Sequence, residues 1–242
     1  MRLDKLICDC GAASRKEAAS AVRAGRATVN GNVIRDPARQ VDPDFDAVVY
    51  CGTPLVYRKF VYVMLHKPAG YVSATDDKTL PYVLELLSPE YKKRELFPLG
   101  RLDRDTTGLL VMTDDGQTAH RCLSPRRHVE KVYAFTCERP LSPDAEKVFE
   151  SGMTIDGGEV CKPARLVPSP DRLSGSVTLT EGKYHQVKRM FERMGNRITS
   201  LSRTSFAGIA LDPALAPGEW RDLTEKETEQ LLHAAGEENR KN

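Results

Sequence analysis

The sequence predicts an α+β protein of two domains, in which a small helix–helix–hairpin domain precedes a larger domain built on a mixed, largely antiparallel sheet. Two short helical patterns and a strong hairpin signal occupy the N-terminal part. The later β-type segments are not regularly separated by crossover helices, which a parallel sheet would require. A length of 242 residues allows one or two domains at about 100–200 residues each.

The first elements are predicted by local patterns. Residues 3–10 place apolar side chains at helical spacing. Ser14 and Glu17 form a capping box, in which each side chain can bond the other residue's backbone amide, so a second helix is expected to begin there. Asn30-Gly31 stands between β-favouring residues and predicts a hairpin, because a type I′ turn needs two positive φ angles.

Domain boundaries follow from a change of composition around Gly52 and Pro54. We expect a small domain over 1–52, a linker over 53–60, a larger domain over 61–235 and a disordered polar tail over 236–242.

The larger domain shows both periodicities. Continuous or alternating apolar residues predict strands at 60–65, 109–112, 131–137 and 176–180. Helices are predicted to begin at Ser142, which precedes a proline, and at Thr224, which opens a second capping box. A third helix is expected where residues 187–194 carry apolar side chains at helical spacing.

Composition excludes several classes of protein. No apolar run approaches the ~20 residues of a membrane span, and the first residues lack the apolar stretch of a secretory signal, so a cytoplasmic protein is expected. Six cysteines show no zinc-ligand spacing. We therefore expect reduced cysteines, mostly in the core, and no metal site.

Charge is nearly balanced overall, at +2, but it is unevenly distributed. Residues 1–40 hold eight basic and four acidic side chains, and residues 183–204 hold six and one. Two basic segments indicate a polyanion bound at two places. The alternative is that both segments are ordinary solvent-exposed faces, whose charges balance with the rest of the chain by chance.

A loop at 100–108, directly before an apolar strand, carries the first candidate for chemistry. Leu102 can anchor the loop by packing, which places Asp103 where its carboxylate is partly desolvated. A carboxylate that acts as nucleophile or base at neutral pH needs a nearby cation to keep it ionised. The alternative is an ordinary turn with capping aspartates.

The segment 181–191 supplies the cation. Lys188 borders the apolar face of the predicted helix and shares a stripe with His185 and Arg189. Arg189 is expected to point outward, where it can meet phosphates. A surface pair between Lys188 and Glu192 is the alternative.

A basic loop at 124–131 leads into a strand with an inward-facing Tyr133. A flipped nucleobase needs an aromatic platform of this kind, although a plain core tyrosine fits the same pattern.

Residues 2–6, 14–18 and 25–31 together resemble the S4 RNA-binding domain over roughly residues 1–50. This resemblance implies RNA contacts from basic side chains of the second helix and the hairpin. They are Arg15, Lys16, Arg23 and Arg26.

The three segments of the larger domain resemble the pseudouridine synthases. Gly100-Arg101-Leu102-Asp103 followed by Thr106 and Gly108 matches their catalytic motif, Lys131-x-Tyr133 matches the motif of their active-site tyrosine, and 181–190 matches the segment whose basic residue pairs with the aspartate. The resemblance implies Asp103 as the catalytic carboxylate, Lys188 as its ion-pair partner and Tyr133 against the base. Many relatives carry arginine where Lys188 stands.

Residues 65–72, 112–117, 124–126 and 181–191 look most like the family's S4-containing branch that acts on small-subunit (16S) ribosomal RNA, which implies uridine 516 as target, no cofactor, and a monomer. Large-subunit (23S) RNA, a non-catalytic assembly factor and a small-molecule hydrolase remain alternatives. The resemblance places His66 and Lys67 at the cleft edge and leaves Asp105 as a loop cap. Further RNA contacts are implied for Arg101, Arg104, Arg126, Arg127 and Arg189.

Overall fold

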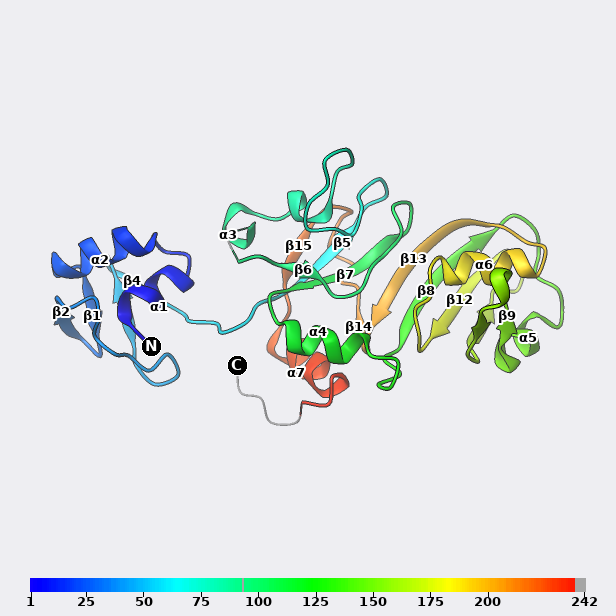
Figure 1. Ribbon diagram of the computed structural model, residues 1–242. Helices are drawn as coiled ribbons and strands as arrows, with labels where there is room; N and C mark the ends of the chain where they lie inside the picture. Colours follow the sequence, from blue (N-terminus) through cyan, green and yellow to red (C-terminus); the bar gives the residue numbers. More distant parts are fainter. Residues whose placement is uncertain (93, 238–242) are drawn as a thin grey trace. The chain divides into compact units, whose positions relative to one another are not determined.

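A computed structural model describes residues 1–92 and 94–237 of the chain (Figure 1). The chain divides into two compact units, Met1–Phe60 and a larger unit that begins at Val61. Of the expected disordered tail, residues 238–242 lie outside the described residues. Glu237 contacts the larger unit, because its carboxylate accepts a hydrogen bond from Thr118 at 3.3 Å and lies 3.5 Å from Arg121.

The N-terminal unit packs two helices on a small sheet. Its elements are α1 (Leu3–Asp9), α2 (Arg15–Arg23), β1 (Ala27–Val29), β2 (Asn32–Ile34), β3 (Val48–Tyr50) and β4 (Thr53–Pro54). The capping box of Ser14 and Glu17 is present, and Asn30 and Gly31 have φ angles of 51° and 81°, as the hairpin prediction requires. Apolar side chains of both helices, including Leu3, form the core.

Two strands of this unit were not expected, and they change its C-terminal boundary. The sheet order is β2-β1-β3-β4, and β4 pairs with β3 through Val49–Pro54 and Tyr50–Thr53. Residues 53 and 54, assigned to the start of a linker from composition, are therefore part of the sheet. Pro54 occupies an edge strand, where a missing backbone N–H costs least.

The larger unit is built on one mixed sheet with the order β11-β12-β8-β13-β7-β5-β15, where β6 also pairs with β7 and β14 with β13. The strands are β5 (Tyr62–Lys67), β6 (Phe97–Pro98), β7 (Thr107–Thr113), β8 (Lys131–Cys137), β11 (Arg165–Pro168), β12 (Ser174–Leu179), β13 (Ile198–Phe206), β14 (Ile209–Ala210) and β15 (Trp220–Asp222). Every pairing is antiparallel except that of β7 with β13. The predicted sheet type is confirmed.

Helices cover this sheet, and a short hairpin of β9 (Met153–Thr154) and β10 (Val160–Cys161) lies beside it. The helices are η1 (Val83–Leu86), α3 (Pro89–Lys92), α4 (Gly116–Leu123), α5 (Ala145–Ser151), η2 (Asp156–Gly158), α6 (Gln186–Arg193) and α7 (Glu225–Ala234). Figure 1 shows α6 across β8 and β12, where the rings of Phe191 and Phe135 meet with centroids 4.8 Å apart. α5 begins at Ala145, after the predicted start at Ser142.

The parallel pairing joins two groups of strands through a close approach at Gly108. Only two residue pairs form it, Thr107–Ser202 and Gly108–Arg203. Gly108 has a φ of +100°, and a Cβ atom there would collide with the backbone of Arg203. Glycine is required here both by conformation and by space.

Within the part of the chain that is described, no helix combines the length and apolar character needed to cross a membrane. The six cysteines are free, and the expected core positions are found for Cys122, Cys137 and Cys161. Cys51, in contrast, is exposed in the N-terminal unit.

Candidate active site

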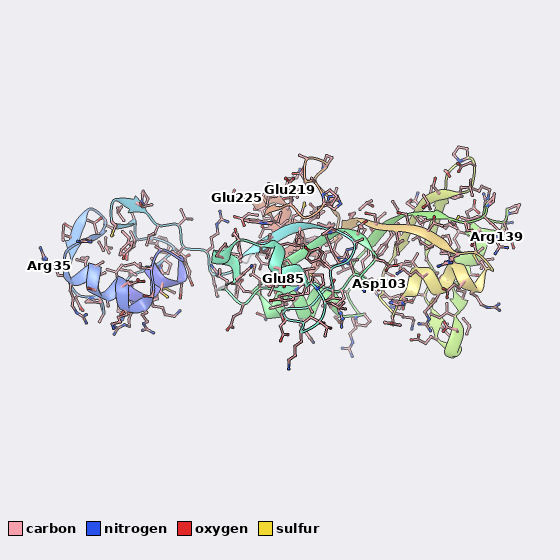
Figure 2. All side chains as sticks on the ribbon, turned by 90° about the horizontal axis from the view of Figure 1, so that it is seen from above. Arg35, Glu85, Asp103, Arg139, Glu219 and Glu225 are labelled. Carbon is pink, nitrogen blue, oxygen red and sulfur yellow. The ribbon has the colours of Figure 1, made fainter. Side chains whose placement is uncertain are left out.

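A cavity of about 630 Å³ opens where the loop before β7, the middle strands of the sheet and the N-terminal end of α6 meet. This volume is typical of ligand sites in proteins. Figure 2 labels Asp103 in this region, near α6. Side chains from all three candidate segments line it, including Arg101, Asp103, Lys131, Tyr133, Lys183, His185 and Lys188, and Arg203 of β13 joins them.

The loop that carries Asp103 is held from below by two polar side chains. Ser73 brackets Leu102, accepting from its amide at 3.0 Å and donating to its carbonyl at 2.9 Å. The Lys67 ammonium donates to the carbonyls of Pro68, Arg104 and Thr106 at 3.0, 3.2 and 2.8 Å. These bonds fix the loop backbone on both sides of Asp105.

The resemblance implied that Lys67 lies at the cleft edge, but the structure places it in the interior. Its side chain is fully buried, and three backbone carbonyl groups satisfy its ammonium. Burial lowers the pKa of Lys67 to about 8.

Lys188 reaches from the first turn of α6 to two carboxylates. Its Nζ lies 2.8 Å from Asp103 and 2.6 Å from Asp105, so it pairs with these residues instead of Glu192. Burial favours the neutral amine, but the hydrogen bonds to Asp103 and Asp105 outweigh it and raise the pKa of Lys188. The structure thus joins two residues 85 positions apart in the sequence.

Asp105 differs from its expected role as a loop cap. Its carboxylate accepts a hydrogen bond from Lys188, and this contact holds the pKa of Asp105 below its usual range. The Asp105 side chain is 73% exposed, whereas that of Asp103 is 24% exposed. Of the two carboxylates, Asp103 is therefore the one that the protein shields from solvent.

His185 adds a second contact to Asp103 that the sequence interpretation did not assign. It precedes α6 in a left-handed conformation with a φ of 48°, and its Nε2 lies 3.5 Å from Asp103 Oδ1. Tyr184 stacks on the imidazole with ring centroids 3.8 Å apart. The signal available in the sequence was the shared stripe of His185 and Lys188.

Tyr133 comes from β8, in the middle of the sheet. Its side chain is 9% exposed, belongs to the core and lines the cavity together with Leu201 of β13. The two readings of this residue, core and cavity wall, both describe its position. Asp103, Lys188 and Tyr133 are thus gathered around one cavity.

Arg203 was missed as a cavity residue because β13 was not predicted, and the residue was counted only as part of a basic segment. It lines the cavity at 1% exposure, and its Nε donates to the Leu109 carbonyl at 2.8 Å. Burial lowers the pKa of its guanidinium, while the neighbouring Tyr133 hydroxyl acts in the opposite direction. Alternation of Leu201 and Arg203 on one strand face was the usable signal.

The residues expected to contact RNA fall into two groups. Most are exposed: Arg15, Lys16, Arg23, Arg26, Arg101, Arg104, Arg126 and Arg127. Arg189 is the exception, since its side chain is 13% exposed and its guanidinium pairs with Asp156 and with Glu159 at 2.6 Å. The expectation of an outward Arg189 is wrong, because the η2 segment folds over α6 and supplies these carboxylates.

Across the described residues, no group of three or more histidine, cysteine or acidic side chains is arranged to hold a metal ion. The side chains that line the cavity include a shielded carboxylate, several cations and an aromatic ring.

The comparisons with known proteins assign each of the two units to a known family. Residues 61–193 match the RNA pseudouridylate synthase family, and residues 1–44 match the S4 domain. The chain is 46% identical to the ribosomal small subunit pseudouridine synthase A of Escherichia coli K12, over 96% of this chain and all of the relative. It is 45% identical to an uncharacterized RNA pseudouridine synthase of Bacillus subtilis, over 96% of this chain and 98% of that protein.

A crystal structure of a pseudouridylate synthase superposes with a TM-score of 0.68 at 36% identity, covering 96% of this chain and 99% of the other. Sequence and fold therefore agree over nearly the whole length. The chain is a member of the RNA pseudouridylate synthase family that carries an N-terminal S4 domain, and it is an enzyme that isomerises uridine to pseudouridine in RNA.

Proposed function

We propose that this enzyme modifies one uridine of small-subunit (16S) ribosomal RNA, at position 516, with Asp103 as its catalytic carboxylate. The observation that carries the proposal is the 2.8 Å ion pair between Asp103 and Lys188 in a cavity that also holds Tyr133. The 16S target is supported by the similarity to a small-subunit enzyme over almost the entire chain.

The reaction breaks a C1′–N1 bond, turns the detached uracil and joins C1′ to its C5 atom, with no net redox change. Asp103 either attacks C1′ or removes the 2′ proton to give a glycal, and both routes need the carboxylate in its ionised form. The Lys188 ammonium supplies the opposite charge in direct contact with Asp103. Tyr133 offers a flat apolar face to the loose uracil.

RNA binding is assigned to the exposed basic side chains of both units. Extruding a stacked uridine costs a few kcal/mol, and phosphate contacts offset that cost. Such contacts release counterions, so the affinity is expected to fall steeply with salt. We assign these contacts to Arg15, Lys16, Arg23, Arg26, Arg101, Arg104, Arg126 and Arg127. We place the enzyme in the cytoplasm. We expect it to be a monomer, which light scattering on the purified protein tests.

Pseudouridine mapping after incubation with 16S RNA, 23S RNA and small-subunit particles tests the proposal. Asp103→Asn keeps the shape of the side chain but removes its charge, so we expect a loss of product by about 10³-fold or more with RNA affinity retained. Glu85→Gln, which neutralises an exposed carboxylate outside the cavity, is the matched control.

Three results would contradict parts of the proposal. Full activity of Asp103→Asn would exclude this carboxylate as the catalyst. Modification of 23S RNA alone would replace the target by the large-subunit RNA. Binding of both RNAs and of the particles without modification of any would exclude all three as substrates.

A further inference from the structure

Arg203 carries a charge and a hydrogen-bond donor that its own chain leaves unused. The residue is 1% exposed, and its Nη2 atom has no hydrogen-bond partner. In the part of the chain that is described, it forms no ion pair with a carboxylate. Its Nε donates to the Leu109 carbonyl, but no opposite charge among the described residues neutralises the guanidinium. A buried charge without a counter-charge costs several kcal/mol, so an anionic or strongly polar ligand would remove a penalty that is present in the free protein.

The surroundings of Arg203 favour an anion. The Phe206 ring packs against the guanidinium with its centroid 5.1 Å away, and the Tyr133 hydroxyl lies beside it. Lys131, a second cation of the cavity wall, donates to the Val129 carbonyl at 2.9 Å. Burial and then the charge of Arg203 lower the pKa of Lys131 to about 8.

The negative charges of the cavity are engaged elsewhere. Asp103 and Asp105 are both held by Lys188. Glu181 also lines the cavity, and its charge partly offsets the lowering of the Lys131 pKa, but its carboxylate accepts hydrogen bonds from the Lys162 amide at 2.9 Å and from Gln186 Nε2 at 2.8 Å. The wall formed by β8 and β13 therefore presents two cations, Arg203 and Lys131. Among the described residues, no carboxylate is hydrogen-bonded to Arg203 Nη2 or to the Lys131 ammonium. It is complementary to negative charge that appears inside the cavity.

We propose that Arg203 contacts the substrate and donates from Nη2 to a carbonyl oxygen of the detached uracil, whose negative charge it stabilises. The inference rests on the proposed function. When the C1′–N1 bond breaks, its electron pair stays on uracil, and the charge spreads over the ring nitrogens and carbonyl oxygens. After the ring turns, C5 supplies the pair for the new C5–C1′ bond, C5 loses its proton and N1 gains one.

This anion exists only between the two bond changes. A cation that faces it stabilises the intermediate and the transition state leading to it more than the neutral bound uridine. Arg203 thereby acts on the step rate, while the phosphate contacts elsewhere determine RNA affinity.

A purely structural role for Arg203 is the competing explanation, because its Nε bonds the Leu109 carbonyl across the contact between β7 and β13. The two explanations differ in their dependence on the leaving group. In 5-fluorouridine the fluorine withdraws electrons, so the base anion is more stable and depends less on the guanidinium. A structural defect slows both bases equally.

The test measures single-turnover loss of the target nucleoside, for uridine and for 5-fluorouridine at the same RNA position. Arg203→Met is expected to slow uridine loss by about 100-fold or more and 5-fluorouridine loss by about 10-fold or less, with RNA affinity within about threefold of wild type. Arg203→Lys should fall between Arg203→Met and wild type. Val111→Ala, a cavity-forming change in β7 outside the site, controls for lost stability.

Equal slowing of uridine and 5-fluorouridine loss, or wild-type rates for Arg203→Met, would overturn the inference. The proposed function would stay intact as long as the wild-type enzyme modifies 16S RNA. A wild-type enzyme inactive on 16S RNA would overturn the proposed target by itself. An RNA that it does modify then serves for the same comparison of uridine with 5-fluorouridine.

Discussion

Replacing Lys67 with methionine removes a buried charge, which stabilises the fold, and three hydrogen bonds, which destabilises it. Burial lowers the pKa of Lys67 from 10.5 to about 8, so the fold disfavours the ammonium by about 3 kcal/mol. The ammonium in turn satisfies three carbonyl groups, and leaving each without a donor costs about 1 kcal/mol or more. Because these terms are similar in size, we expect Lys67→Met to change the free energy of unfolding at pH 7 by less than about 2 kcal/mol.

Activity should respond much more strongly than stability. Two of the carbonyl groups, those of Arg104 and Thr106, belong to the loop that positions Asp103. A displacement of about 1 Å at a reacting group can cost about 100-fold in rate. We therefore expect single-turnover pseudouridine formation by Lys67→Met to fall by about that factor.

The pH dependence gives the sharpest check. Between pH 8 and 10.5 the unfolded wild-type chain holds a proton at Lys67 that the folded chain has lost, so wild-type stability rises with pH relative to the variant. This difference should grow by about 2 kcal/mol from pH 7 to pH 9.5. Urea unfolding followed by the fluorescence of Trp220, the single tryptophan, reports on the larger unit alone. A pH-independent difference, or a large loss of stability with an unchanged rate, would refute the reasoning.

Two further predictions concern stability. Gly108→Ala should lower the free energy of unfolding by more than about 2 kcal/mol. Gly116→Ala is the control and should not lower it, because a Cβ atom added there meets no atom within 4 Å. Equal effects of the two variants in the Trp220 assay would contradict the close approach at Gly108. The Arg221 guanidinium holds the pKa of Glu227 down at about 2, against 4.5 ordinarily. The ionised Glu227 carboxylate therefore stabilises the folded state by up to about 3 kcal/mol above pH 4.5, and this stabilisation is lost as the pH falls toward 2. The free energies of unfolding of wild type and Glu227→Gln should converge near pH 2.

Local signals in the sequence predicted local structure well. The capping box of Ser14 and the Asn30-Gly31 turn each depend on atoms within a few residues, and both are found as expected. Patterns of apolar residues also predicted the centres of β8 and α6. The boundary near residue 53 was less predictable, because a two-residue edge strand has no periodicity of its own.

The fate of charged side chains depends on partners that are distant in sequence. Lys67 is buried because carbonyl groups 37 and 39 positions away accept from it, and Arg189 turns inward because carboxylates 30 and 33 positions away face it. No local pattern encodes these partners. Lys188 was predictable as a cavity residue only because a short apolar stripe fixed the helix face beside which it lies.

The contact between β7 and β13 makes the site a composite of two halves of one sheet. One half brings Asp103, and the other brings Tyr133, Lys188 and Arg203. Along the strands they pair at two positions, and the hydrogen bond from Arg203 to Leu109, the ion pair of Asp103 with Lys188 and a shared apolar core also join them. Loosening of this contact would draw the Asp103 carboxylate away from the Lys188 amine. Heat inactivation is then expected at temperatures where the spectroscopic signals of helices and strands are still native.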